Sequence, residues 1–166
     1  MLGIRYLKVQ PTSYVLHYVG GKVRHEGAGL AFFYFAPTAE IVRIPLASTD
    51  APFVFNEVTA DFQDATIQGQ LTYRIKSPKH IAEVLDYSVD GRGIYRSDDP
   101  NKLGERLTNA AQIAARAFTQ RHVLKDLLVK TDALVAEVLA SLKQSEAVDM
   151  LGLEILALNV ASAKAT

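Results

Sequence analysis

A run of aromatic residues is the part of the sequence whose residue types point most directly to a function. Phe32, Phe33, Tyr34 and Phe35 follow one another between two glycines, at positions 27 and 29, and a proline at position 37. Such a run is either covered on both faces or reserved for contact with something other than water. In a lipid interface the rings would be buried while the tyrosine hydroxyl stays near polar headgroups. We therefore expect a membrane contact formed by Leu30, Phe32, Phe33, Tyr34 and Phe35, with a doubly buried strand as the alternative.

The length of the run limits what this contact can be. A helix needs about 20 apolar residues to cross a bilayer, so the run cannot span one. As a strand it would point successive side chains to opposite faces, and a core on one face cannot take all four rings. We therefore expect at least one of Phe32 and Phe33 to be exposed.

Residues that could catalyse a reaction or bind a metal do not form a known motif. The sequence has no cysteine. Asp61 and Asp64 lie where aspartate commonly forms a turn, and the segment 91–93 (Gly-Arg-Gly) lacks the preceding apolar strand of a phosphate-binding loop. Four histidines fall in separate predicted elements and read as surface or structural residues, at His17, His25, His80 and His122. We expect no enzymatic activity, no cofactor and no metal site.

Composition narrows the class of protein further. The chain has 166 residues, of which 49% are hydrophobic and 22% charged, as in an ordinary globular fold. Eighteen basic residues balance eighteen acidic ones, so nucleic acid is not expected as a partner. The first residues carry charges and form no secretory signal or transmembrane span. We expect a cytoplasmic protein that is peripheral at a membrane, and an integral one only if an anchor precedes Met1.

The first half of the sequence predicts strands. Between Ala65 and Ile75 apolar and polar residues alternate without a break, which places Ile67, Leu71 and Tyr73 on the core face. The preceding segment groups Val54, Asn56 and Val58 on one side, and turn residues at 61–64 join the two strands into a hairpin. Further strands are expected at 6–10, 14–19, 22–25, 30–35 and 40–46, with a tight turn at the glycines 20 and 21.

The second half predicts helices and one last strand. Ser77 and Pro78 begin a short helix that ends near Leu85, and a loop follows at 89–99. Apolar residues three and four apart predict helices from about 100 to 122 and from about 131 to 142, with a turn between them. Gly152 follows as a helix C-cap, and residues 153–160 form the last strand. The fold class is therefore α+β: an antiparallel, strongly twisted N-terminal sheet, then helices, then one returning C-terminal strand.

Taken in order, these segments resemble the SPFH or band 7 family, which includes stomatins, prohibitins, flotillins and bacterial membrane-protease regulators. The matching segments are a valine-rich strand with its glycine-lysine turn at 15–23, the Gly-Ala-Gly-Leu segment at 27–30, the alternating strand ending in Tyr-Arg-Ile at 65–75, the helices at 78 and 103–118, and the strand at 151–160. Ala28 stands where the family usually has proline. Each motif alone is weak, and their order carries the resemblance.

The resemblance implies a non-enzymatic scaffold that organises membrane patches or regulates membrane proteins such as proteases. It implies a single domain over residues 1–166, with an N-terminal β subregion at 1–50, an α+β subregion at 51–160, and the start of a C-terminal helical or coiled-coil region at 161–166. The implied partners are a lipid surface, other protomers of a homo-oligomer, and a membrane protease or another membrane protein. A soluble protein-binding adaptor without membrane contact is the alternative.

Overall fold

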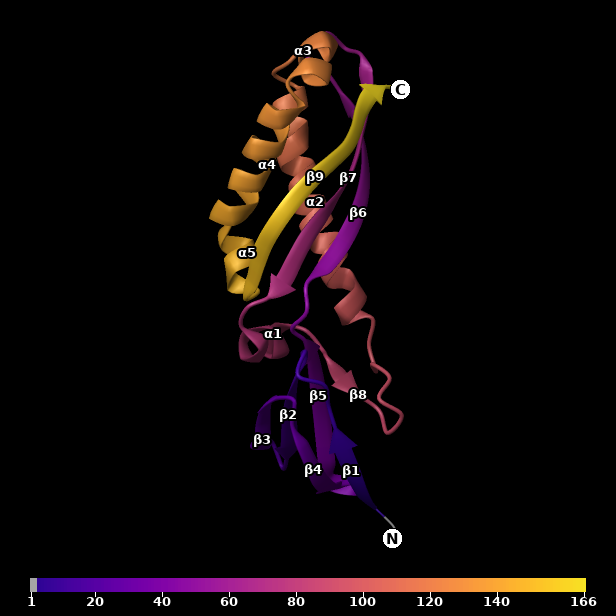
Figure 1. The fold of residues 1–166 in the computed structure, drawn as a ribbon, viewed down its shortest axis with the longest axis vertical. Coiled ribbons are helices and arrows are strands. Elements are labelled where there is room, and N and C mark those ends of the chain that lie inside the picture. The colour runs from indigo at the N-terminus through magenta and orange to yellow at the C-terminus, as the bar shows by residue number, and fades with distance from the viewer. Residues whose placement is uncertain (1–2) are drawn as a thin grey trace. The chain divides into compact units, whose positions relative to one another are not determined.

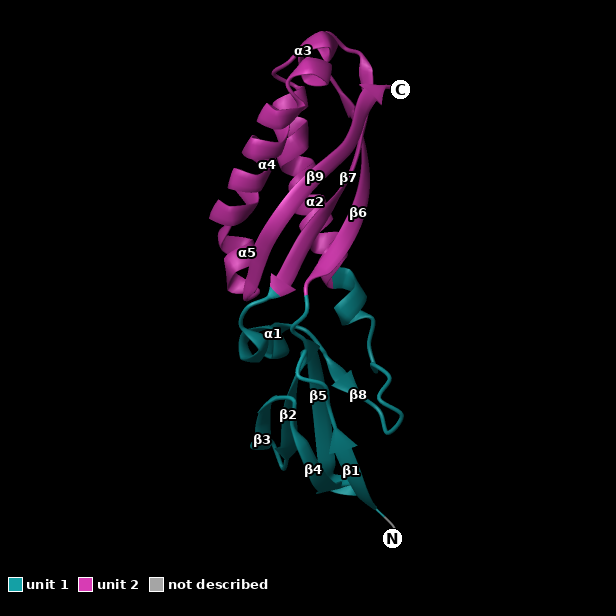
Figure 2. Ribbon diagram, in the orientation of Figure 1, with its two compact units in different colours: residues 1–47, 75–102 teal, residues 48–74, 103–166 magenta. Residues whose placement is uncertain are grey.

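The computed structural model describes residues 3–166, which form two compact units. Within the described residues, unit 1 comprises 3–47 and 75–102, and unit 2 comprises 48–74 and 103–166 (Figure 2). Each unit is therefore built from two separate stretches of the sequence. The elements are labelled in Figure 1.

Unit 1 is mainly β-structure. Its strands are β1 (Ile4–Lys8), β2 (Ser13–Val19), β3 (Lys22–Ala28), β4 (Ala31–Phe35), β5 (Ala39–Pro45) and β8 (Ser88–Val89). They form a two-stranded ribbon, β1-β4, and a four-stranded sheet in the order β3-β2-β5-β8, and all of these pairs are antiparallel. A short 3-10 helix η1 (Ala36–Thr38) and the helix α1 (Pro78–Val84) complete the unit.

The predicted glycine turn is confirmed in unit 1. Gly20 and Gly21 have φ angles of 59° and 78° and join β2 to β3. Both angles lie in the left-handed region that glycine adopts at little cost, which is why this turn takes two glycines. The turn makes β2 and β3 neighbours in the sheet, and their pairing shifts register between His17 and Tyr18.

Unit 2 packs helices on one face of a sheet. The sheet has the order β6-β7-β9, with β6 (Thr49–Val58), β7 (Asp64–Ile75) and β9 (Leu153–Ala165). Its helices are α2 (Asp99–Thr119), of which the residues from 103 on belong to this unit, α3 (Leu124–Val129), α4 (Thr131–Gln144) and α5 (Glu146–Met150). Figure 1 shows α2 and α4 lying along the same side of the three strands.

Apolar side chains occur at every second position on one face of β6 and β7, and this is the face that the helices cover. The predicted core face of β7 is confirmed, because Ile67, Leu71 and Tyr73 are buried. On β6 the buried side chains include Phe53 and Phe55, whereas the side that carries Val54 is exposed. The apolar stripe of α2 supplies the opposing layer through Leu103, Leu107, Ala111, Ala114, Ala115 and Phe118.

The α+β fold class is confirmed, with 34% helix and 42% strand. Three details differ from the expectation. The loop expected at 89–99 contains the end of β8, the short helix α5 follows α4, and β9 continues to Ala165 beyond the predicted end at 160. Gly152 does follow a helix, α5, with a φ angle of 71°.

Candidate functional site

The most exposed aromatic surface of unit 1 lies on the outer face of the β1-β4 ribbon. In the antiparallel register Ile4 pairs with Phe35 and Tyr6 pairs with Phe33. Because side chains alternate along a strand, these four lie on the same face. Their exposed fractions are 49%, 50%, 56% and 70%, in the order Ile4, Phe35, Tyr6, Phe33. We call these four residues the aromatic face.

The structure separates the five residues that the sequence singled out. Phe33 and Phe35 point outward on the aromatic face. Phe32 is buried in the core of unit 1, and Leu30 and Tyr34 are partly buried and pack against that core. The expectation that Phe32 or Phe33 is exposed is confirmed, and the run is not a doubly buried strand.

Two members of the aromatic face, Ile4 and Tyr6, were missed at the level of sequence. The ring centroids of Tyr6 and Phe33 lie 4.9 Å apart, so the two residues act as one apolar surface. The sequence of β1 gives little sign of this face, because Arg5 between Ile4 and Tyr6 is exposed as well and only Leu7 is partly covered. What the sequence could not reveal is that β1 pairs with β4, which lies more than twenty residues away.

A stack of three rings supports the ribbon from its inner side. Phe32 stacks on His25 with centroids 4.3 Å apart and on His17 with centroids 5.0 Å apart. The Nδ1 atoms of the two histidines are 3.0 Å apart, and the tautomers decide which one donates. The Nε2 atom of His17 is buried and has no hydrogen-bond partner among residues 3–166. Burial lowers the pKa of His17, and the neighbouring His25 and Arg24 lower it further.

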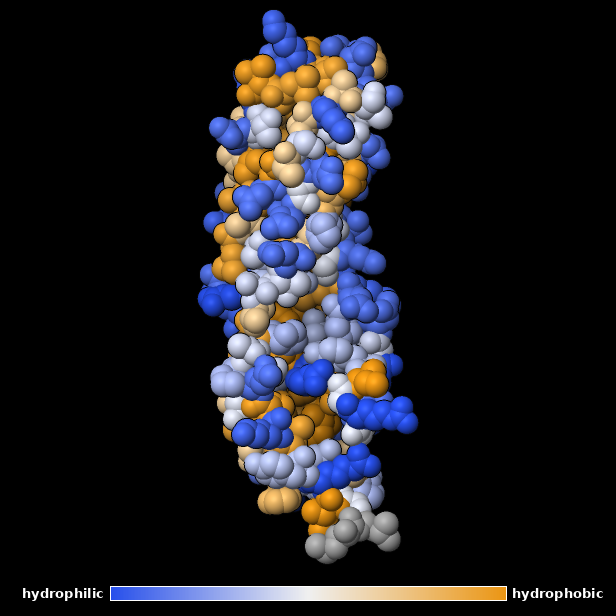
Figure 3. All heavy atoms as spheres, turned by 45° about the vertical axis from the view of Figure 1, so that its right-hand side comes forward, coloured by the Kyte–Doolittle hydropathy of each residue, from blue (hydrophilic) through white to orange (hydrophobic). Residues whose placement is uncertain are grey.

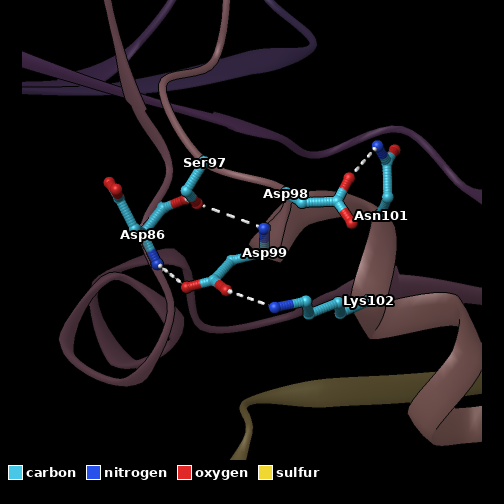
Figure 4. Close-up of polar contacts among 6 residues, drawn as sticks. All are labelled: Asp86, Ser97, Asp98, Asp99, Asn101 and Lys102. Carbon is cyan, nitrogen blue, oxygen red and sulfur yellow. Dashed lines mark hydrogen bonds and ion pairs between the residues drawn. The ribbon is translucent and has the colours of Figure 1, made fainter.

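Carboxylates gather at the start of α2, but their hydrogen bonds are local (Figure 4). Asp99 accepts a hydrogen bond from the backbone N–H of Asp86 at 2.9 Å, and its own N–H donates to the Ser97 hydroxyl at 3.1 Å. The other carboxylate oxygen of Asp99, Oδ1, lies 3.8 Å from the Lys102 ammonium nitrogen. Hydrogen bonds from Ser88 lower the pKa of Asp86. These groups therefore hold the helix start in place, and none is arranged as an acid and base pair.

The most buried carboxylate with an ion pair lies in unit 2. Glu57 is 7% exposed and accepts hydrogen bonds from Gln112 and from the Arg116 guanidinium, both at 3.0 Å. Breaking such a pair leaves an uncompensated buried charge, so its role is to fix α2 on β6.

The described part of the chain, residues 3–166, contains no group of three or more His, Cys, Asp or Glu side chains placed to hold a metal ion. Within the same residues, no helix is both long and apolar enough to cross a membrane.

Comparison with known proteins assigns the chain to a family. The model of the SPFH domain / Band 7 family matches residues 7–165. No match was found among curated proteins. The matched stretch includes every strand of both units except the first residues of β1, together with all of the helices described above. The chain therefore belongs to the SPFH domain / Band 7 family.

Proposed function

We propose that this chain is a membrane-associated scaffold module, and that its aromatic face is the surface that contacts lipid. Members of the SPFH/Band 7 family are generally membrane-associated scaffolds and generally non-enzymatic. The observation that supports a lipid contact is the exposure of Phe33, Phe35, Tyr6 and Ile4 on one face of one ribbon. Lys8 lies on that face as well and is exposed, which suits a cation near headgroups.

The free energies involved indicate that one copy of the chain binds a membrane only weakly. Complete burial of a large apolar side chain contributes about 1.5–3 kcal/mol, so four residues that are half exposed supply on the order of 3–6 kcal/mol. Docking a protein onto a surface costs an estimated 4 kcal/mol or more in lost freedom of motion. We therefore propose a homo-oligomer in which several copies of the face engage one membrane, since avidity multiplies weak contacts. Within such an assembly residues 1–166 act as one functional domain, and the regulated partner is a membrane protein such as a protease.

The absence of tryptophan from the sequence makes the lipid contact directly measurable. Phe33→Trp introduces the only tryptophan of the chain on the aromatic face, and its emission can be excited apart from that of the tyrosines. We expect its emission to shift to shorter wavelength on phosphatidylcholine vesicles, and to be quenched by lipids with brominated acyl chains, because the ring enters the apolar layer. The matched control is Phe62→Trp, since Phe62 is 87% exposed in unit 2 and is not part of the face.

The control variant should show neither the shift nor the quenching. If Phe33→Trp also shows neither when several copies of the chain are linked together, so that avidity compensates for weak binding by one copy, the lipid contact is wrong and the protein-binding adaptor remains. Phe33→Glu should abolish vesicle binding and change the free energy of unfolding by no more than about 0.5 kcal/mol, as expected for a surface site.

A further inference from the structure

We propose that unit 1 carries a binding pocket for the phosphate of an anionic lipid headgroup, built around Arg5, Arg43 and Arg92. The inference rests on the proposed function and adds the lipid class that the module selects. The pocket has a volume of about 230 Å³. Residues of β1, β5 and β8 line it, together with the turn at 90–93 that follows β8. A water molecule occupies about 30 Å³ in the liquid, so the space suits a larger group.

The charges that line the pocket are unbalanced. Three arginines and one aspartate, Asp90, give a formal charge of +2, although the whole chain has a net charge of zero. Among residues 3–166, none of the three guanidinium groups forms an ion pair with a carboxylate. Guanidinium groups bind phosphate oxygens through pairs of parallel hydrogen bonds, so their free donors match a phosphate.

Asp90 offsets only one of the three positive charges, and its carboxylate is held by the backbone of the turn. The Oδ1 atom accepts hydrogen bonds from the N–H groups of Arg92 at 2.8 Å and Ile94 at 3.1 Å. These bonds lower the pKa of Asp90, and the positive charges of Arg92 and Arg96 lower it further. The aspartate thus shapes the turn that presents Arg92.

The other two arginines are held by contacts that leave donors free. Arg5 donates one hydrogen bond, from Nη1 to the carbonyl oxygen of Gly91 at 3.1 Å. Arg43 lies over the ring of Tyr95, with its Cζ atom 5.2 Å from the ring centre. A Cβ atom at position 91 would lie 2.4 Å from Nη1 of Arg5, so a larger residue there would displace the guanidinium, which is the flexible end of that side chain. The positions of both guanidinium groups are therefore defined by the fold of unit 1.

The pocket is continuous with the aromatic face through β1. Tyr6 belongs to the aromatic face and also lines the pocket, and Arg5 precedes it on the same strand. Adjacent side chains on a strand point to opposite faces, so one strand separates the apolar surface from the arginines. Figure 3 shows hydrophobic residues directly beside strongly hydrophilic ones on the face of unit 1 in view. Because Tyr6 borders both surfaces, we assign to the pocket the phosphate of a lipid whose acyl chains contact the aromatic face, and not a soluble phosphate.

The test compares binding to phosphatidylcholine vesicles with and without phosphatidic acid, read through the Phe33→Trp fluorophore at about 0.15 M salt, where distant charges are screened. We define selectivity as the ratio of the two affinities. Arg92→Gln should lower selectivity about fivefold, the usual effect of one basic residue at an anionic surface. Arg106→Gln is the control, because it removes the same charge from an exposed position on α2 and should leave selectivity unchanged.

A second variant tests geometry without changing charge. Gly91→Ala should displace the Arg5 guanidinium and lower selectivity while net charge stays the same. If Gly91→Ala and Arg92→Gln both keep the wild-type selectivity, or if Arg106→Gln lowers it as much as Arg92→Gln does, the pocket is not a headgroup site. Insertion of the fluorophore into pure phosphatidylcholine would still support the proposed function in that case.

Competition with inorganic phosphate or glycerol 3-phosphate distinguishes a site for a lipid headgroup from a site for a soluble phosphate. For a lipid site we expect neither, at about ten times the phosphatidic acid concentration, to displace the protein from vesicles. Complete displacement by either one, lost in Arg92→Gln, would show a pocket for soluble phosphate and overturn the assignment to a lipid.

Discussion

At the scale of single residues, His17 couples the stability of unit 1 to pH. It is 4% exposed, its Nε2 atom has no partner among residues 3–166, and its pKa is lowered from 6.5 by burial and by the nearby His25 and Arg24. Well above pH 6.5 the residue is neutral in both states, and no stability is lost. As the pH falls below 6.5 the unfolded state takes up the proton first, so stability falls until the lower folded-state pKa is reached.

We therefore expect the melting temperature to fall between pH 7 and pH 5 and His17→Phe to flatten this dependence. One proton contributes a slope of at most about 1.4 kcal/mol per pH unit. Phenylalanine keeps an aromatic ring against Phe32 and removes the unpartnered nitrogen. Thermal melts followed by circular dichroism at several pH values measure both effects. Parallel curves for wild type and variant would show that other groups cause the acid sensitivity.

The strands that carry His17 and His25 could be predicted from the sequence, but the contact between the two side chains could not. The sequence placed His17 and His25 in neighbouring strands joined by a glycine turn, and both strands are present. The 3.0 Å contact between the two Nδ1 atoms depends on the register shift at residues 17 and 18, and the turn alone does not specify it.

At the scale of elements, β7 has the clearest relation between sequence pattern and packing. Leu71 is fully buried, whereas Thr72 points to the opposite face and hydrogen-bonds Asp50 at 2.6 Å in an exposed position. We expect Leu71→Ala to lower the free energy of unfolding by about 2–5 kcal/mol through the cavity that it leaves. Thr72→Ala should cost no more than about 1.5 kcal/mol, the value of one exposed hydrogen bond. Denaturant melts compare the two, and equal small losses would mean that this face of β7 is not packed in solution.

Elements were predictable where they bury a long apolar stripe. Alternation along β7 and the three- and four-residue spacing along α2 predicted the elements and, for β7, the buried face, since a buried face leaves a periodic pattern. The two residues of β8 and the five of α5 are too short to show a period. The end of β9 consists of Ala, Ser and Lys, so only its neighbours in the sheet identify it as strand, as in the hydrogen bond from Thr166 N–H to the Asp64 carbonyl at 3.1 Å.

The candidate site, too, could be predicted only where a single segment of the sequence shows it. The sequence identified Phe33 and Phe35 through their residue type, but the choice between them and Phe32 needed to know which side of β4 faces the core. Ile4 and Tyr6 lie beside Phe35 and Phe33 because β1 pairs with β4, and the sequence alone does not show this pairing. The arginine pocket was invisible because its residues come from three distant segments, at 5, 43 and 92.

At the scale of the whole molecule, the aromatic face is too small to hold two copies together. A large aromatic side chain buries roughly 150–250 Å² when it is fully covered. Four residues that are half exposed therefore offer on the order of 400 Å², about half of what each partner contributes to a stable interface. We expect residues 1–166 at about 10–100 µM to sediment mainly as a monomer or weak oligomer, and Phe33→Glu to leave that distribution unchanged. A stable ring formed by residues 1–166 would contradict this expectation. If Phe33→Glu left that ring intact, another surface of the module would drive assembly. If Phe33→Glu abolished the ring, the aromatic face would be a contact between protomers instead of with lipid.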